Sequence, residues 1–355
     1  MNRKITGHSD LLPNRKPGDP KFVDHPIPDK KGRRIFDVTM FSGEAAMLYT
    51  RLWRYYDYVD QFVIGILPRT FTNIPTNYSF WPFEEELKQF MDKVLIIREI
   101  PEDRIYKNLD SHKSFSYEHS WRVYFLEVIR QKFHPKNGDL IFASDLDEII
   151  TREGIEYLIN HWPTQQIHPL TRHSQPNFLY DQGDWCCPVI FPYSDNMPDL
   201  LTLRKRVHIT PITREVVATH CSWCFTHLEN YTRKKNAYSH QEKNFWPKND
   251  DSYTFRYHWC RFWDDWKMNF IKPGLAHTGT TLKNLLPDHP HLKYLTSPYY
   301  MLDITKTIWE YEDLDTMCTS NFPSREEWEK KAKAKGIYVI RTPLPVTEEA
   351  IFKKN

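Results

Sequence analysis

Apolar and polar residues alternate along residues 34–161 in two recurring patterns. Short apolar runs rich in β-branched and aromatic residues predict strands, and longer segments with apolar residues three and four apart predict helices. The expected strands cover 35–41, 62–67, 93–97 and 140–143, and the expected helices cover 44–56, 84–91, 117–133 and 151–161. Strand, helix and strand in this order predict an α/β fold with a mostly parallel central sheet flanked by helices.

The pattern loosens on both sides of this region. Residues 1–33 hold five prolines among polar and charged residues, which predicts a flexible basic arm without a core of its own. In the second half of the chain, short aromatic runs at 177–180 and 189–193 stand among prolines and histidines. Helices are expected from about 228–240 and 325–335.

The overall charge and hydropathy argue against two classes of protein. Lys and Arg total 48 and Asp and Glu total 46, a net charge of +2, so no nucleic acid is expected as a partner. No apolar stretch reaches the roughly 18 residues that predict a membrane span. The first thirty residues also lack the apolar segment of a signal peptide, so we expect a cytoplasmic location for the chain as it stands.

Three carboxylates follow the apolar run at 140–143. Asp145 and Asp147 are two residues apart, so in an extended segment both project to the same side, and Glu148 comes next. Ligands of parallel sheets collect at the carboxyl ends of strands, and a carboxylate pair with phosphate oxygens suits Mn²⁺ or Mg²⁺. The alternative is that Asp145 or Asp147 caps the helix at 151–161. A second Asp-x-Asp at 313–315 has no strand before it and is interpreted as a solvated helix face.

The cysteines leave several interpretations open. Six cysteines are too few for a disulfide scaffold in 355 residues. Cys221 and Cys224 lie between His220 and His227, a spacing that resembles a zinc site. A redox dithiol, a disulfide and a packed aromatic turn around Trp223 are the alternatives to zinc.

Several motifs in sequence order resemble glycosyltransferase family 17 between about residues 34 and 300. They include Glu118 with Arg122 on one expected helix face, the Asp-x-Asp-Glu at 145–148 and the His-Cys-Ser-Trp-Cys-Phe at 220–225. The other matching segments are 36–44, 48–52, 59–64, 69–72, 239–244 and 286–287. Several collinear motifs are more specific than any one of them, because a short motif on its own is common.

The resemblance implies a GT-A fold and a division of the chain. It implies an inverting transfer from a nucleotide-sugar donor such as UDP-GlcNAc to a glycan or glycoprotein acceptor, with Mn²⁺ (or Mg²⁺) as cofactor. We expect the domain to span 34–300, with a donor-binding half at 34–162 and an acceptor half at 163–300. The expected helical C-terminal extension covers 301–355.

The resemblance also implies roles for individual side chains. Inversion needs a general base for the acceptor hydroxyl, and Glu242 beside His240 is preferred, with Glu148 and Asp264 as alternatives. Asp145 and Asp147 are the expected metal ligands. The expected donor-binding residues are Asp37, Phe41, Glu44, Arg122 and Asp145, and the expected acceptor-binding residues are His220 and Trp223. For Arg122, an ion pair with Glu118 is an equal alternative, and for Trp223 the alternative is core packing.

Two positions depart from the family pattern. Ile66 stands where the family has Glu, and Thr219 stands where it has Trp before the histidine. A catalytically inactive carbohydrate-binding relative, another donor such as UDP-xylose and a zinc-stabilised interaction protein are therefore the competing functions. The acceptor, the linkage and the oligomeric state do not follow from the motifs, and the Golgi lumen is the expected location if an N-terminal anchor precedes this sequence.

Overall fold

The computed structural model describes the following part of the chain: 26–70, 75–80, 84–105, 113–169, 171–175, 178–180, 187–205, 218–220, 263–264, 269–270, 324, 326–327, 330 and 334. The chain divides into two compact units. The first unit consists of Met1–Arg172 and Asp184–His220, and the second of His173–Gly183 and Cys221–Asn355. The first unit contains the central sheet and all of the residues that form the candidate site.

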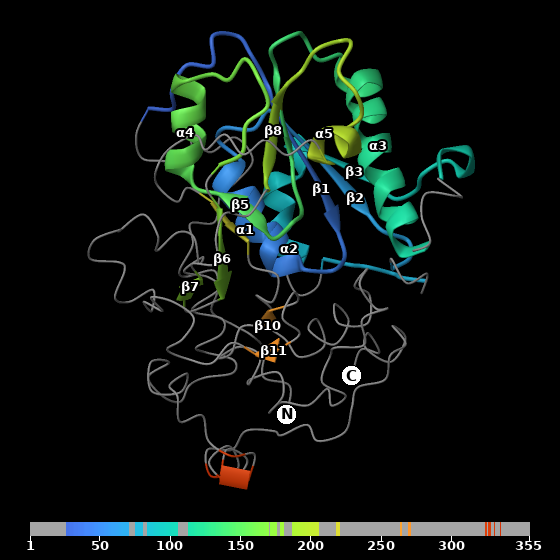
Figure 1. Cartoon of the computed structure of the whole chain (residues 1–355), viewed down its shortest axis with the longest axis vertical. Coiled ribbons are helices and arrows are strands. Elements are labelled where there is room, and N and C mark those ends of the chain that lie inside the picture. Colours follow the sequence, from blue (N-terminus) through green and yellow to red (C-terminus); the bar gives the residue numbers. More distant parts are fainter. Residues whose placement is uncertain are drawn as a thin grey trace. The chain divides into compact units, whose positions relative to one another are not determined.

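Five strands form the central sheet of the first unit (Figure 1). Their order is β3-β2-β1-β4-β8, and the first four are parallel while β8 is antiparallel to β4. The strands are β1 (Ile35–Phe41), β2 (Gln61–Ile66), β3 (Val94–Ile97), β4 (Leu140–Ala143) and β8 (Val189–Pro192). This confirms the predicted α/β architecture, which is compatible with a GT-A fold.

The predicted helices are present, with different bounds in two cases. They appear as α1 (Ala45–Tyr55), α3 (Lys113–Phe133) and α4 (Arg152–Asn160), and α3 begins four residues before the expected start. The segment expected as one helix at 84–91 is a short α2 (Glu84–Leu87) followed by a 3-10 turn at Lys88–Lys93. Further short elements are a 3-10 turn at Glu102–Arg104, and α5 (Leu200–Lys205), which packs on α3 on the same side of the sheet (Figure 1).

A close approach between β2 and α3 sets the position of that helix. A Cβ atom added to Gly65 of β2 would lie 2.7 Å from the ring of Trp121 and 2.8 Å from that of Phe125. Trp121 is fully buried and Phe125 is 2% exposed, so the helix packs tightly on the sheet here. Arg122 follows Trp121 directly, and this packing therefore fixes the backbone that carries it.

The order of the strands defines where a ligand is expected. The chain adds β2 and β3 on one side of β1, and then places β4 on the other side. In open parallel sheets, ligands bind outside the carboxyl ends of the strands at such a reversal. The loop from Ser144 to Asp147 begins at that edge.

Smaller strands complete the described residues. The segment β5 (Glu148–Ile150) pairs antiparallel with β9 (Ala218–His220), and β6 (Thr171–Gln175) pairs with β7 (Phe178–Tyr180). A last pair joins β10 (Trp263–Asp264) and β11 (Asn269–Phe270). The arm at 1–25 and the expected helix at 228–240 lie outside the described residues, while described positions at 326, 327, 330 and 334 are helical. Among the described helices, none is long and apolar enough to span a membrane.

Candidate functional site

A buried arginine of α1 fixes the loop that follows β4. Nε and Nη2 of Arg51 donate to the two carboxylate oxygens of Asp37 at 2.7 and 2.6 Å. Nη1 donates to the backbone carbonyls of Asp145 and Glu148, both at 3.0 Å, and Nη2 also donates to the hydroxyl of Ser144. Every N–H of the guanidinium thus has an acceptor, and the backbone between β4 and β5 is held in one conformation.

The pair of Asp37 and Arg51 is closed to solvent. Both side chains are 1% exposed. Burial by itself lowers the pKa of Arg51, but the charge of Asp37 outweighs burial and raises that pKa above its ordinary value. These contacts favour a structural role for Asp37, which is predicted from sequence as a donor-binding residue.

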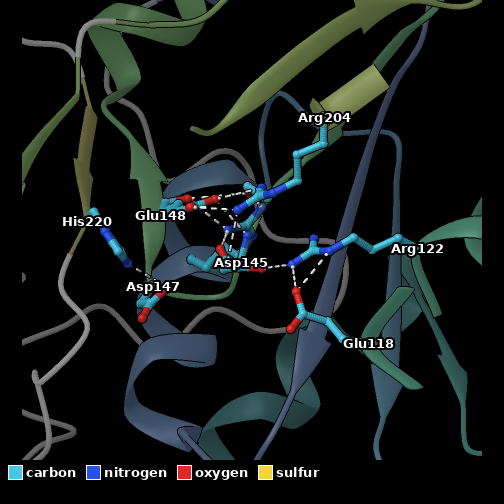
Figure 2. Close-up of polar contacts among 9 residues, drawn as sticks. Glu118, Arg122, Asp145, Asp147, Glu148, Arg204 and His220 are labelled. Carbon is cyan, nitrogen blue, oxygen red and sulfur yellow. Dashed lines mark hydrogen bonds and ion pairs between the residues drawn. The ribbon is translucent and has the colours of Figure 1, made fainter. Parts of the chain in front are cut away.

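Two arginines from different helices hold the carboxylate of Asp145 (Figure 2). Nη2 of Arg122 in α3 donates to Oδ1 at 2.6 Å, and Nη2 of Arg204 in α5 donates to Oδ2 at 3.0 Å. The side chain of Asp145 is 36% exposed, whereas those of the two arginines are 8% and 15% exposed. The carboxylate therefore lies at the border of the protein, with the charges that neutralise it on the inner side.

The charges around Asp145 keep it ionised. Burial raises the pKa of this carboxyl group, but Arg122 and Arg204 outweigh burial and hold the pKa well below its ordinary value. The two arginines respond in the opposite sense: burial lowers their pKa, and the charge of Asp145 raises it above the ordinary value. The group is thus fully charged at neutral pH.

Arg204 also binds the neighbouring glutamate. Its Nη2 and Nη1 donate to the two carboxylate oxygens of Glu148 at 2.9 and 3.1 Å, and the backbone N–H of Asp145 donates to Oε2 at 2.8 Å. The side chain of Glu148 is fully buried. A carboxylate that accepts these charge-assisted bonds is a weak base, so its contacts favour a positioning role over that of general base.

The two sequence-based interpretations of Arg122 hold together. Nη2 donates to Glu118 Oε1 at 2.7 Å, one turn away on α3, while the same nitrogen contacts Asp145. The guanidinium thus bridges α3 and the β4–β5 loop (Figure 2). Glu118 balances part of its charge.

Asp147 lies against β9. Its Oδ1 is 3.7 Å from Nε2 of His220, and the two side chains are 9% and 11% exposed. The register of β5 and β9 pairs Glu148 with His220, which brings the histidine to this loop. The predicted acceptor-binding residue His220 and the predicted metal ligand Asp147 are therefore neighbours.

A small cavity lies between the sheet and the two arginines. Its lining includes Thr39 of β1, Ser144, Arg122 and Arg204, so it sits where β1 and β4 separate. The cavity has room for about one water molecule, far less than a nucleotide sugar requires. Thr39 Oγ1 is buried without a hydrogen-bond partner among the described residues.

The remaining predicted residues fall into two groups. Phe41 is fully buried, with edge-on ring contacts to Tyr78 and Phe80, and Glu44 accepts a bond from the Ser42 N–H at 3.2 Å beside the start of α1. These positions favour packing and loop roles. The following predicted residues lie outside the described part of the chain: Glu242, His240, Trp223, Cys221 and Cys224.

Sequence reasoning missed two of the arginines that organise the site and misplaced one cap. Neither Arg51 nor Arg204 has a spacing that points to the acidic loop, although Arg51 lies in a segment that resembles family 17. The cap of α4 is Thr151, whose side chain accepts a bond from the Gly154 N–H at 2.9 Å, so the alternative in which Asp145 or Asp147 caps that helix is wrong. The strand β5 separates both aspartates from the helix.

The side chains at the loop fit a hard divalent cation in their chemistry. Asp145 and Asp147 supply carboxylate oxygens, and Mg²⁺ or Mn²⁺ sites often use one or two carboxylates together with substrate phosphates. Within the described residues, no three His, Cys, Asp or Glu side chains are grouped so as to hold a metal ion by themselves. The pair therefore fits a cation whose coordination is completed by phosphate oxygens.

Comparison with known proteins decides the family. The family model described as Glycosyltransferase family 17 matches residues 25–261, more than half of the chain. The chain belongs to glycosyltransferase family 17. The family assignment makes it a glycosyltransferase, with a nucleotide-sugar donor and a glycan acceptor as its class of substrates. The matched segment includes the Asp145 loop, both arginines that bind it, and His220.

Other comparisons add little to the family 17 assignment. No curated protein matches the chain. Among solved structures, it is similar to the crystal structure of 4-diphosphocytidyl-2C-methyl-D-erythritol synthase, with 11% identity and a TM-score of 0.30. That match covers 50% of this chain and 86% of the other.

Proposed function

We propose that this family 17 protein transfers N-acetylglucosamine from UDP-GlcNAc to a mannose-containing or other glycan, in a β linkage and with inversion at the anomeric carbon. The observation that carries the proposal is the acidic loop at the strand reversal. Asp145 and Asp147 follow β4 at the edge where ligands of parallel sheets bind, and two buried arginines face them. Glycosyl transfer to water or a glycan needs this concentration of charge around a diphosphate leaving group.

Asp145 and Asp147 would hold Mn²⁺ or Mg²⁺ against the diphosphate. The cation supplies neutralisation of the charge that develops on the leaving nucleoside diphosphate. Arg122 contributes a second cation of fixed geometry, because guanidinium groups pair with phosphate oxygens in two-pronged fashion. Arg51 keeps the backbone of the loop in place for both aspartates.

The transfer itself exchanges one bond at the anomeric carbon for another. The acceptor hydroxyl oxygen forms the new C1–O bond, the bond between C1 and the diphosphate oxygen breaks, and UDP leaves. The hydroxyl proton passes to a general base, for which Glu242 with His240 beside it is our assignment. Glu148 supports the loop in this scheme, because its oxygens are already bound by Arg204 and the Asp145 N–H.

The test is a nucleotide-release assay of the full chain with UDP-GlcNAc, UDP-xylose and other nucleotide sugars, with Mn²⁺ and with a chelator. We expect release of UDP from UDP-GlcNAc that depends on Mn²⁺ and rises when glycan acceptors are added. Asp147→Ala should fold normally and reduce release by at least about 10²-fold, since it removes a group that stabilises developing charge. The matched control is Asp103→Ala, whose side chain is 78% exposed.

Three results would change this proposal. Turnover of UDP-xylose in place of UDP-GlcNAc would reassign the donor sugar. Binding of glycans without turnover of any donor would favour the inactive carbohydrate-binding relative. Undiminished release by Asp147→Ala would remove the metal assignment at this aspartate.

A further inference from the structure

The two arginines at Asp145 create a conflict with its expected role. Arg122 donates to one carboxylate oxygen and Arg204 to the other. A divalent cation that coordinated Asp145 in this arrangement would lie a few ångströms from two guanidinium groups, and like charges at such distances repel strongly where water is partly excluded. Asp145 in this conformation therefore disfavours a cation that arrives alone.

A diphosphate resolves this conflict by its charge. Phosphate oxygens compete with a carboxylate for guanidinium groups, because both anions offer two acceptors to the same fork of N–H donors. Transfer of Arg204 from Asp145 to a phosphate would free Oδ2, and the added negative charge would offset the repulsion between the arginines and a cation. Glu148 remains as the second anchor of Arg204, since two of its oxygens bind that side chain.

The surroundings give the arginines room to change partners. The cavity with space for about one water molecule is lined by both Arg122 and Arg204. The backbone of Asp145 stays fixed meanwhile, because Arg51 binds its carbonyl and is itself held by Asp37. Only side chains have to move.

We propose that Arg204, together with Arg122, holds Asp145 in the free protein and exchanges it for the diphosphate of the donor, so that cation binding at Asp145 depends on the diphosphate. This inference rests on the proposed nucleotide-sugar function. Arg204 acts as a positioning residue that couples the two ligands. Because such coupling is reciprocal, the diphosphate tightens cation binding by the same factor by which the cation tightens diphosphate binding.

Binding measurements on the full chain test the coupling without turnover. Free Mn²⁺ is followed by electron paramagnetic resonance, and UDP and inorganic pyrophosphate are titrated by calorimetry, each alone and together with Mn²⁺. For the unaltered protein, UDP should tighten Mn²⁺ binding by about tenfold or more, within the usual range of ~5–150-fold. Pyrophosphate should act in the same direction, since the exchange requires the diphosphate and not the base.

Substitution of Arg204 should weaken this coupling. Arg204→Gln should bind Mn²⁺ alone about tenfold more tightly and UDP without metal about tenfold more weakly than the unaltered protein. Arg204→Lys, which keeps the charge but loses the fork, should lie between them. Arg104→Gln is the matched control, because Arg104 pairs with Asp103 and Glu127 at an exposed position and should leave both affinities unchanged.

Arg204→Gln leaves the buried Glu148 carboxylate without its cation, so the double variant Arg204→Gln/Glu148→Gln is measured as well. It removes the stranded charge and should show the same tighter binding of Mn²⁺ alone. Unchanged Mn²⁺ affinity in both variants, with UDP binding intact in the unaltered protein, would overturn the role of Arg204 and leave the proposed function standing. If neither UDP nor pyrophosphate binds the unaltered protein with Mn²⁺, the nucleotide donor itself is wrong and this inference fails with it.

Discussion

Two arginine–carboxylate clusters lie on either side of one short loop, and they differ in exposure. In the first, Arg51 and Asp37 are each 1% exposed, and every guanidinium N–H has an acceptor. In the second, the carboxylate of Asp145 is 36% exposed and is shared by Arg122 and Arg204. The first cluster is closed to any ligand, and the second faces the edge of the sheet where ligands are expected.

The difference separates the support of the site from its chemistry. Arg51 binds the carbonyl of Asp145, while Arg122 and Arg204 bind its carboxylate. The backbone of this residue is therefore held by a buried pair that gains nothing from a ligand. Its side chain is held by cations that can also bind phosphate. Substitutions in the two clusters should accordingly affect different quantities.

The largest expected effect is on stability, from the closed cluster. Arg51→Met should lower the free energy of unfolding by ~3–5 kcal/mol, because it leaves the buried Asp37 carboxylate unpaired. Urea unfolding followed by circular dichroism measures the change. The double variant Asp37→Leu/Arg51→Met removes both charges and should regain part of the loss. A cost below about 1 kcal/mol for the single variant would contradict the closed role of this pair.

The open cluster should respond in activity. Asp145→Asn should lower UDP release in the transfer assay by at least about 10²-fold, since it removes a charge that faces the leaving group. The free energy of unfolding should change by less than about 1 kcal/mol, because the carboxylate is partly solvated. Arg204 retains Glu148, and Arg122 retains Glu118. A stability loss as large as that of Arg51→Met would erase the distinction between the clusters.

A third arginine sharpens the comparison from the opposite side. Arg54 on α1 is 1% exposed, and none of its three guanidinium nitrogens has a hydrogen-bond partner. Burial lowers the pKa of Arg54 to about 9, and the charge of Arg152 adds to this. Arg54→Met should therefore raise the free energy of unfolding at pH 7 by ~2 kcal/mol, by removing unsatisfied buried donors.

The pH dependence of this effect has a definite sign. The pKa of Arg54 is lower in the folded than in the unfolded protein, so the unfolded state binds more protons above pH 9. The penalty is complete below that pH and shrinks as the pH rises, so the difference between the unaltered protein and Arg54→Met should narrow above pH 9. Arg104→Met is the control, with an expected change within about 0.5 kcal/mol. Equal stability of Arg54→Met and the unaltered protein at pH 7 would show that Arg54 is compensated.

Local patterns carry much of the fold in this chain. The apolar runs at β1, β2 and β4 and the periodic segment of α1 identify their elements correctly, because period and composition are properties of neighbouring residues. The strand β5 escapes such reasoning, since three residues are too short for a pattern. The 3-10 turn after α2 does so for the same reason.

For the site, the sequence alone places the carboxylates and not their partners. Asp145 and Asp147 follow an apolar strand, so their position at the carboxyl edge of a parallel sheet is determined by the residues around them. Arg51 and Arg204 reach this loop across separations of 94 and 59 residues. Nothing in local spacing encodes such contacts, because they exist only once the helices are packed on the sheet. Tertiary packing therefore decided which aspartate is sealed and which remains within reach of a ligand.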